Sequence, residues 1–220
     1  GHSVTEARRQ SGQSWQHSAI SAAIWSGRSS PASRRALGAW VERVVFSAPD
    51  AHGQPAPLPF ATPDLRTRHV ALTPGNFNPA LLASGSIPFM LQAVHDIPGA
   101  PPGAYWDGGI TDYHLHLDYA GHAAQGRGPG IVLYPHFQRA VVPGWLDKGL
   151  RWRHHATHFL DTLLLLAPNP EWVHRLPRAK LPDRKDFEFH ATDPAARMRD
   201  WNTAVAASHQ LAEEFAQWLE

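Results

Sequence analysis

The chain has 220 residues, of which 43% are hydrophobic and 18% are charged, a composition typical of a folded domain. Twenty Lys and Arg residues nearly balance nineteen Asp and Glu residues, so the net charge does not favour binding to nucleic acid. Cysteine is absent, which excludes disulfides, thiolate zinc sites and cysteine nucleophiles, and no apolar run approaches the roughly 20 residues of a membrane-spanning helix. We therefore expect one domain over residues 1–220, in the cytoplasm.

The first predicted elements are two helices followed by two strands. The spacing of apolar residues predicts a helix over Gln10–Trp25 and a second helix capped by Ser30, with Pro31 at its first position. Runs rich in β-branched residues predict strands over Val41–Ala48 and Arg68–Thr73.

Helices and strands continue to alternate along the rest of the chain. A helix is expected to begin with Asn78 as its cap and Pro79 next, and to end at Ile87–Pro88. Three short apolar runs predict strands: Gly103–Asp107, Gly130–Pro135 and Thr162–Pro168. A long helix should open at Asp193–Pro194 and bury one stripe, formed by Trp201, Val205, Leu211, Phe215 and Trp218. The alternation predicts an α/β fold with a mostly parallel sheet.

The run from Gly103 to Tyr119, GAYWDGGITDYHLHLDY, gathers acids, glycines and histidines within a short stretch. If its second half is a strand, His114, His116 and Asp118 point to one face, and imidazole and carboxylate ligands suit zinc, iron or manganese. The same strand would equally turn its tyrosines and leucines to the core and this polar set to solvent. The pattern leaves both a metal site and a solvated or hydrogen-bonded face open.

The first half of this run allows a different chemistry. Asp107 ends a predicted strand and is followed by Gly108 and Gly109, and functional groups of α/β proteins collect at such strand ends. The two glycines would allow backbone angles that a Cβ forbids and would let another segment approach closely. The carboxylate could then accept a proton from a neighbouring hydroxyl. A common tight turn is the alternative, and Asp112 equally suits a turn or a helix cap.

Several pieces of the chain occur in the order found in a known family. They are Asp64-Leu65-Arg66-Thr67, Ala80-Leu81-Leu82-Ala83-Ser84, Ile87-Pro88, and Asp107-Gly108-Gly109 with Asp112. Over roughly Pro57 to Leu117 the chain resembles the second half of the patatin-like phospholipase domain. In that family a DLRTG-like turn, a helix reading aLlASgaIP and a DGG-x-x-D turn follow one another.

The resemblance implies a three-layer α/β/α fold, here incomplete, and a lipid acyl hydrolase that uses a Ser–Asp dyad and no cofactor. Asp107 would be the dyad acid, Gly108 and Gly109 would support its turn, and Asp112 would be the second acid of the motif. The substrate would be a lipid or another acyl ester.

One part of the family's pattern does not occur in this sequence. The glycine-rich oxyanion loop and the G-x-S-x-G nucleophile elbow of the family precede the DGG turn, and neither occurs in these 220 residues. Ser3 lacks the second glycine, so we do not take it as the nucleophile. Ser84 and Ser86 match positions that pack against the family's site, although both also suit a helix end. We expect a C-terminal portion of a patatin-like domain, with the nucleophile on a missing N-terminal segment of the same protein.

A second apolar stretch suggests a transient contact with a membrane surface. Its apolar residues are Trp145, Leu146, Leu150 and Trp152, and its basic residues are Lys148, Arg151 and Arg153. Aromatic and basic residues together suit a membrane interface, although a helix that packs its tryptophans in the core is the alternative. Two other functions stay open: a metal-dependent hydrolase built on His114, His116 and Asp118, and a non-catalytic lipid-binding relative.

Overall fold

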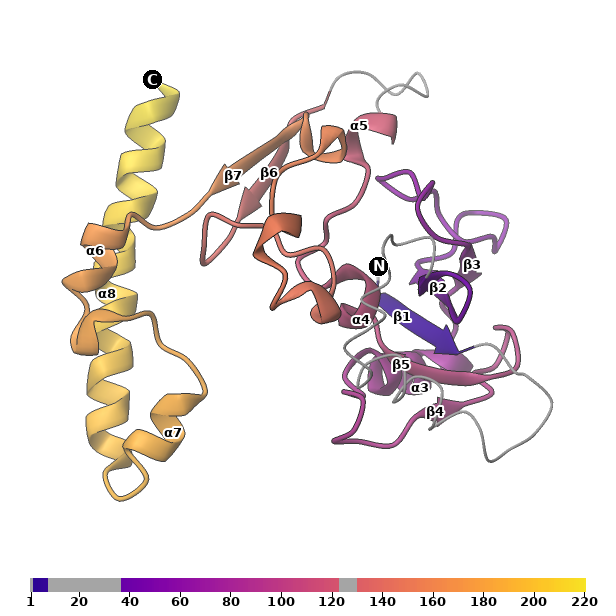
Figure 1. The fold of residues 1–220 in the computed structure, drawn as a ribbon, viewed down its shortest axis with the longest axis horizontal. Coiled ribbons are helices and arrows are strands. Elements are labelled where there is room, and N and C mark those ends of the chain that lie inside the picture. The colour runs from indigo at the N-terminus through magenta and orange to yellow at the C-terminus, as the bar shows by residue number, and fades with distance from the viewer. Residues whose placement is uncertain (1, 8–36, 123–129) are drawn as a thin grey trace. The chain divides into compact units, whose positions relative to one another are not determined.

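The structure is a computed structural model that describes residues 2–7, 37–122 and 130–220 (Figure 1). Its contacts define two compact units. Unit 1 comprises the described residues up to Val132 together with Ala140–Leu163, and unit 2 comprises Leu133–Arg139 and Leu164–Glu220. The helices predicted over Gln10–Trp25 and from Ser30 lie outside the described residues. The single domain over residues 1–220 stays a prediction.

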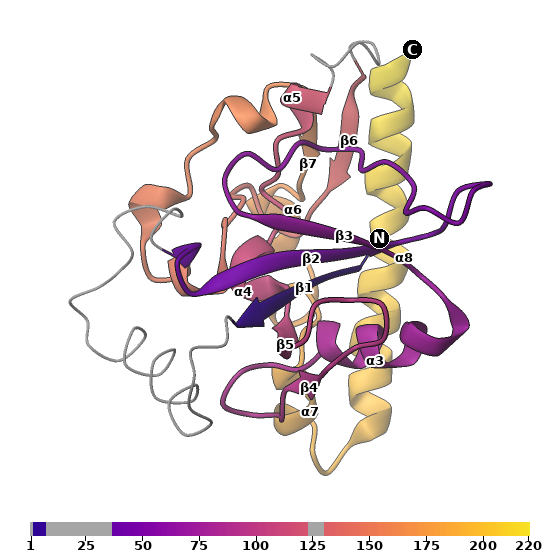
Figure 2. The ribbon, with the colours of Figure 1, turned by 90° about the vertical axis from the view of Figure 1, so that its right-hand side faces the viewer.

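Unit 1 is organised around a five-stranded sheet with the order β3-β2-β1-β5-β4 (Figure 2). The strands are β1 His2–Ala7, β2 Val41–Ser47, β3 Thr67–Ala71, β4 Val94–His95 and β5 Ala104–Asp107. β2 pairs in parallel with β3, whereas β1 is antiparallel to both β2 and β5, and β4 is antiparallel to β5. β2, β3 and β5 consequently run in one direction. The three strands predicted in this region are confirmed.

Strand β2 lies at the centre of the hydrophobic core of unit 1. Six consecutive residues, Val41 to Phe46, are buried, as expected for a strand covered on both faces. The core cluster consists of Val44, Phe46, Val70, Ala80, Ala83, Ile97 and Tyr105. The same strand buries Glu42 and Arg43, and charged side chains are rarely buried unless they are paired.

Helix α3, Pro74–Ser84, begins one turn earlier than the sequence predicts. Thr73 is its cap: the Thr73 hydroxyl accepts a hydrogen bond from the Asn76 amide (3.2 Å), and the Asn76 side chain accepts one from the Thr73 amide (2.8 Å). The predicted start at Asn78 is wrong because Thr73–Pro74 repeats the same cap-and-proline pattern upstream, and the reciprocal capping box satisfies two otherwise unpaired backbone donors there. Pro79 lies inside the helix.

The rest of unit 1 consists of short helical turns. They are α4 Gly109–Asp112, α5 Tyr119–His122, and the 3₁₀ turns η2 Trp145–Asp147, η3 Arg151–Arg153 and η4 His158–Leu160. The segment around Trp145 is therefore a pair of 3₁₀ turns rather than a packed α-helix. Trp152 is 69% exposed, while Trp145, Leu146 and Leu150 are half-buried.

Strands β6, Val132–Pro135, and β7, Leu163–Leu166, form a two-stranded sheet and confirm two further predictions. The backbone amide of Val132 donates to the Thr162 carbonyl (2.8 Å), and that of His136 donates to the Leu166 carbonyl (2.8 Å). The two bonds advance in the same direction along both segments, so the strands are parallel.

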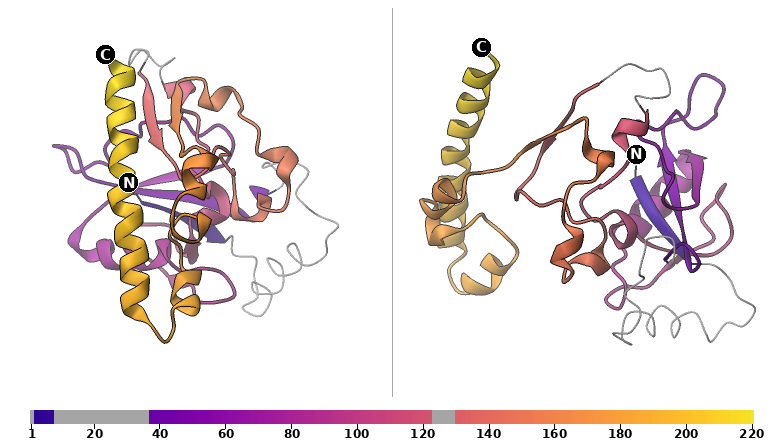
Figure 3. Two further views of the ribbon diagram at one scale, coloured as in Figure 1. Left: turned by 90° about the vertical axis from the view of Figure 1, so that its left-hand side faces the viewer. Right: turned by 45° about the horizontal axis from the view of Figure 1, so that its top comes forward.

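The helical part of unit 2 is organised around α8, Pro194–Leu219, whose predicted cap, Asp193, accepts a hydrogen bond from the Ala196 amide (Figure 3). The shorter elements are α6 Pro170–His174, η5 Pro177–Ala179 and α7 Lys185–Phe189. Trp172, Leu176 and Ala204 form its core, with Leu211 packed against it.

The predicted buried stripe of α8 is wrong at two positions, because Val205 is 62% and Trp218 is 66% exposed. The core of unit 2 reaches α8 through Ala204, Ala207 and Leu211, so these two side chains lie outside the part of the helix that its neighbours cover. None of the described helices combines the length and apolar character needed to cross a bilayer. Three of the four strand pairings in the five-stranded sheet of the described residues are antiparallel, so the predicted mostly parallel sheet is wrong there. The described elements support a mixed α/β class.

Candidate functional site

Asp107 lies at the carboxyl end of β5, where the chain turns directly into α4. Its backbone amide donates to the Ser86 carbonyl (3.0 Å), and its carboxylate oxygen Oδ1 accepts a hydrogen bond from the Gly109 amide (2.7 Å). The side chain is half-buried. Among the described residues, its second oxygen, Oδ2, accepts no hydrogen bond. One oxygen is thus held in place and the other is available.

The two glycines of this turn do not act through unusual backbone angles. Gly108 has φ −62° and ψ −17°, the ordinary right-handed region, so that part of the prediction is wrong. The prediction of a close approach is supported at Gly109, where an added Cβ would lie 3.0 Å from the Asp107 oxygen Oδ1 and 3.5 Å from Tyr113 Cδ2. Gly109 leaves the space into which the Asp107 carboxylate folds.

Asp112 is in a different environment although it is only five residues away. It is buried, and its carboxylate accepts hydrogen bonds from Arg43 Nε (2.7 Å), Arg43 Nη2 (2.7 Å) and the Thr111 hydroxyl (2.9 Å). Both oxygens are therefore engaged, and this two-point guanidinium–carboxylate geometry is the strongest form of such a pair. Asp112 is thus the buried partner of an arginine and lies at the carboxyl-terminal end of α4.

Arg43 joins this acid to a second one. Its guanidinium also donates to both carboxylate oxygens of Asp64 (3.1 Å each) and to the Thr67 hydroxyl (3.2 Å). Burial by itself would lower the pKa of Arg43, but the hydrogen bonds and charges of Asp112 and Asp64 outweigh it and raise that pKa above its usual value. The arginine stays charged at every pH at which the protein is folded.

Arg43 is the residue of this site that the sequence analysis missed. Its signal was a charged side chain inside a strand of otherwise apolar character, VERVVFS. Such a residue requires a buried partner of opposite charge. The partner could not be chosen from the sequence, because Asp112 lies 69 residues away.

A separate segment, residues 142–144, contacts α4 and the residues that follow it. The Pro143 carbonyl accepts a hydrogen bond from the Tyr113 amide (2.9 Å), and the Val142 carbonyl accepts one from the His114 amide (3.1 Å). At Gly144 an added Cβ would lie 2.7 Å from the Ile110 carbonyl oxygen. Residues 142–144 thus lie directly against α4 and hold the turn that follows Asp107.

The histidines beyond α4 do not form the predicted strand face. Leu115 has φ +49° and is exposed, which breaks any extended run, whereas His114, His116 and Asp118 are all buried. A solvated face is therefore wrong, whereas the contacts of these three side chains fit the hydrogen-bonded alternative. His114 Nδ1 accepts a hydrogen bond from the Val142 amide (3.0 Å), and Asp118 Oδ1 accepts one from the Gly121 amide (2.6 Å).

The three polar residues of this run therefore have separate partners. The third, His116, has its Nε2 3.4 Å from the Thr157 hydroxyl. Over residues 37–121 and 130–220, no three His, Cys, Asp or Glu side chains come together in a way that could hold a metal ion. The structure does not bring His114, His116 and Asp118 together as one site.

The serines near the site do not present a nucleophile to Asp107. Ser86 is buried and its hydroxyl donates to the Leu82 carbonyl (2.9 Å), so it closes the end of α3. Its backbone carbonyl is the group that contacts Asp107. Ser84 is the last residue of the same helix. Ser3 lies within β1, paired with Val45, and not on a strand-to-helix turn.

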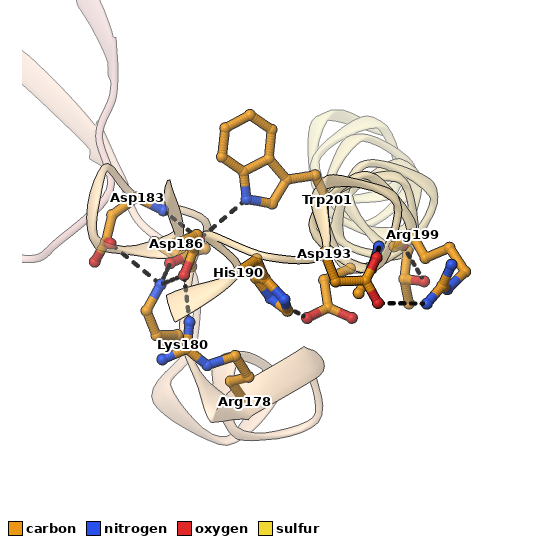
Figure 4. Close-up of polar contacts among 12 residues, drawn as sticks. Arg178, Lys180, Asp183, Asp186, His190, Asp193, Arg199 and Trp201 are labelled. Atoms are coloured by element: carbon orange, nitrogen blue, oxygen red, sulfur yellow. Dashed lines mark hydrogen bonds and ion pairs between the residues drawn. The ribbon is translucent and has the colours of Figure 1, made fainter. Parts of the chain in front are cut away.

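Unit 2 also contains a buried acid, Asp186. Figure 4 shows Arg178, Lys180 and Trp201 converging on it, with hydrogen bonds of 2.6, 2.7 and 3.0 Å, and the Asp183 amide adds a fourth (2.9 Å). Burial alone would raise the pKa of Asp186, but the bonds from Lys180, the Asp183 amide and Trp201, with the charge of Lys180, outweigh it and hold that pKa well below its usual range. The cluster ties the segment before α7 to α8.

Comparisons of the chain with protein-family models, with curated proteins and with solved structures found no match in any of the three. The chemistry of the site is therefore argued from its own geometry. That geometry distinguishes one acid with an available oxygen, Asp107, from one that is fully engaged, Asp112.

Proposed function

We propose that this chain supplies the acid of a Ser–Asp dyad in a lipid acyl hydrolase, with Asp107 as that acid. The observation that carries the proposal is the state of its carboxylate: Oδ1 is held by the Gly109 amide at 2.7 Å, and Oδ2 accepts no hydrogen bond from any described residue. A general base needs this combination of a fixed position and a free lone pair. The resemblance of the Asp107–Asp112 turn to the patatin-like DGG-x-x-D motif supports the same assignment.

In the proposed reaction, a serine oxygen attacks the acyl carbonyl carbon while its proton passes to Asp107 Oδ2. The tetrahedral intermediate then collapses, the ester C–O bond breaks, and the leaving alcohol takes the proton from Asp107. Water hydrolyses the acyl-serine in a second cycle in which Asp107 again accepts a proton. The proposal takes the serine and the oxyanion donors from a further segment of the same protein, because no serine of the described residues donates a hydrogen bond to Asp107.

The surface next to Asp107 supports an apolar acyl substrate. Residues 70–94 contain no acidic, basic or histidine side chain. Just beyond Ser86, which contacts Asp107, the exposed side chains are Ile87, Phe89, Met90 and Leu91. An exposed apolar patch of this kind is typical of a surface that meets an apolar partner. The transient membrane contact predicted at Trp145–Arg153 is also part of this proposal, and the exposed Trp152 side chain supports it.

The test is Asp107→Asn in the full-length protein, assayed with p-nitrophenyl butyrate. Removing a general base should lower kcat by about 10²–10⁴-fold, with the unfolding midpoint unchanged because Asn can still accept the Gly109 hydrogen bond. Asp161→Asn is the matched control, since Asp161 is exposed and its side chain has no hydrogen bond among the described residues. Wild-type turnover by the Asp107 variant would refute the proposal. Failure of the wild-type protein to react with a fluorophosphonate probe would favour the non-catalytic lipid-binding alternative.

A further inference from the structure

Arg43 and Asp107 do not touch in this structure, yet a short series of polar contacts connects them. Arg43 is completely buried in strand β2, and its guanidinium binds Asp112 through two hydrogen bonds of 2.7 Å. The Thr111 hydroxyl donates to the same Asp112 carboxylate (2.9 Å). The guanidinium thus holds the carboxyl-terminal end of α4 in one place.

The amino-terminal end of α4 is held by the same residues. The Gly108 carbonyl accepts hydrogen bonds from the Asp112 amide (2.9 Å) and the Thr111 amide (3.1 Å). The Thr111 hydroxyl also lies 3.1 Å from this carbonyl, but its single proton serves either the carbonyl or the Asp112 carboxylate. Two amide donors, one of them from the residue that Arg43 binds, therefore converge on one carbonyl oxygen. This convergence sets the direction in which the Gly108 carbonyl points.

That carbonyl belongs to the same peptide group as the amide that holds Asp107. The peptide bond between Gly108 and Gly109 is planar and trans, so the direction of the Gly108 C=O determines the direction of the Gly109 N–H. The Gly109 N–H donates to Asp107 Oδ1 (2.7 Å). A rotation of this single peptide plane would move the donor away from the Asp107 carboxylate.

We propose that Arg43 is a positioning residue for Asp107: through Asp112, Thr111 and the Gly108–Gly109 peptide plane, it sets the orientation of the dyad carboxylate. This inference rests on the proposed acyl-hydrolase function. The planar guanidinium is essential to it, because a lysine in the same place would keep the charge but not the two-point contact that fixes the Asp112 carboxylate. Stability alone does not account for the arrangement, since buried ion pairs can often be replaced by apolar residues without loss.

The test uses Arg43→Lys and Thr111→Val in the full-length protein. Turnover of p-nitrophenyl butyrate is measured per active site, with the sites titrated by a fluorophosphonate so that unfolded protein is not counted. A misplaced catalytic group can cost on the order of 10²-fold in rate. We expect Arg43→Lys to lower kcat by about 10- to 100-fold and Thr111→Val by less, both with KM nearly unchanged. Arg68→Lys is the matched control, because Arg68 pairs with Glu42 on the same sheet and its side chain is 46% exposed.

A purely structural role would lower the unfolding midpoint and leave kcat per titrated site unchanged, and that result would overturn the proposal. The variants are also combined with Asp107→Asn. If Arg43 acts through Asp107, then Arg43→Lys should cause no further loss in that background; a full further loss would show that it acts independently. If Arg43→Lys does not fold, Thr111→Val decides the question, because it retains the buried ion pair. Wild-type activity of Asp107→Asn alone would instead refute the proposed function.

Discussion

The buried pair of Arg43 and Asp112 makes a stability prediction that does not depend on any function. Asp112→Ala removes two hydrogen bonds of 2.7 Å from a guanidinium with no exposed surface. Breaking a buried ion pair by removing one partner costs about 3–5 kcal/mol. Arg43 would still contact Asp64 at 3.1 Å, so we expect the low end, about 3 kcal/mol. For a chain of this size that free energy lowers Tm by about 6–12 °C.

Two further variants test whether Asp112 is the main partner of Arg43 by comparing their costs in unfolding free energy. Asp64→Ala should cost less than Asp112→Ala, about 1.5–3 kcal/mol, because the Asp64 contacts are longer and its side chain is 10% exposed against 1% for Asp112. Arg68→Ala should cost at most about 1 kcal/mol, since it removes an exposed pair. Thermal unfolding followed by near-UV circular dichroism measures all three. An Asp112→Ala Tm within about 2 °C of wild type, or a larger effect of Asp64→Ala, would refute the assignment of Asp112 as the main partner.

Three other predictions concern packing, the Asp107 turn and pH. Gly144→Ala should cost about 1–3 kcal/mol in thermal unfolding, because its Cβ would lie 2.7 Å from the Ile110 carbonyl oxygen; an unchanged Tm would contradict this close approach. Gly109→Ala should lower ester turnover with little change in Tm, because its Cβ would lie 3.0 Å from Asp107 Oδ1 and displace the carboxylate; wild-type kcat would contradict it. The folded protein holds the pKa of Asp186 well below its usual range, so its stabilisation is present above the unfolded value of about 3.9 and is lost as the pH falls below it. Unfolding monitored from about pH 5 to about pH 2 should therefore depend less on pH in Asp186→Asn, and an equal dependence would count against this role.

The elements that the sequence predicted well are those whose signals are local. Val41–Ser47 is a strand because its apolar and β-branched run needs only the neighbouring strands to be buried. The long helix α8 begins where an Asp193 cap is followed by proline. The start of α3 was misplaced because two cap-and-proline pairs, Thr73–Pro74 and Asn78–Pro79, lie close together. The Asn76 side chain, which completes a capping box with Thr73, favours the first pair.

The run after α4 was misread because its structure depends on distant contacts. Alternation of polar and apolar residues from Tyr113 to Tyr119 predicted a strand with a polar outer face. In the structure His114 bonds to Val142, 28 residues away, and His116 lies near Thr157, 41 residues away. These partners bury the imidazoles and break the extended backbone. A local sequence pattern cannot show these contacts, because Val142 and Thr157 lie far outside the seven residues over which polar and apolar side chains alternate.

The difference between Asp107 and Asp112 likewise depends on distant contacts and not on local sequence. Asp107 and Asp112 are both aspartates at the ends of one short helix, and sequence alone treats either as a turn residue. What separates them is the partner of each carboxylate: Asp112 binds the fully buried guanidinium of Arg43, and among the described residues Asp107 accepts a hydrogen bond from one backbone amide. Arg43 engages both oxygens of the Asp112 carboxylate, whereas the Gly109 amide engages one oxygen of Asp107. In the proposed function, Arg43 thus has two effects: it engages both oxygens of Asp112, and through the Gly108–Gly109 peptide it orients Asp107.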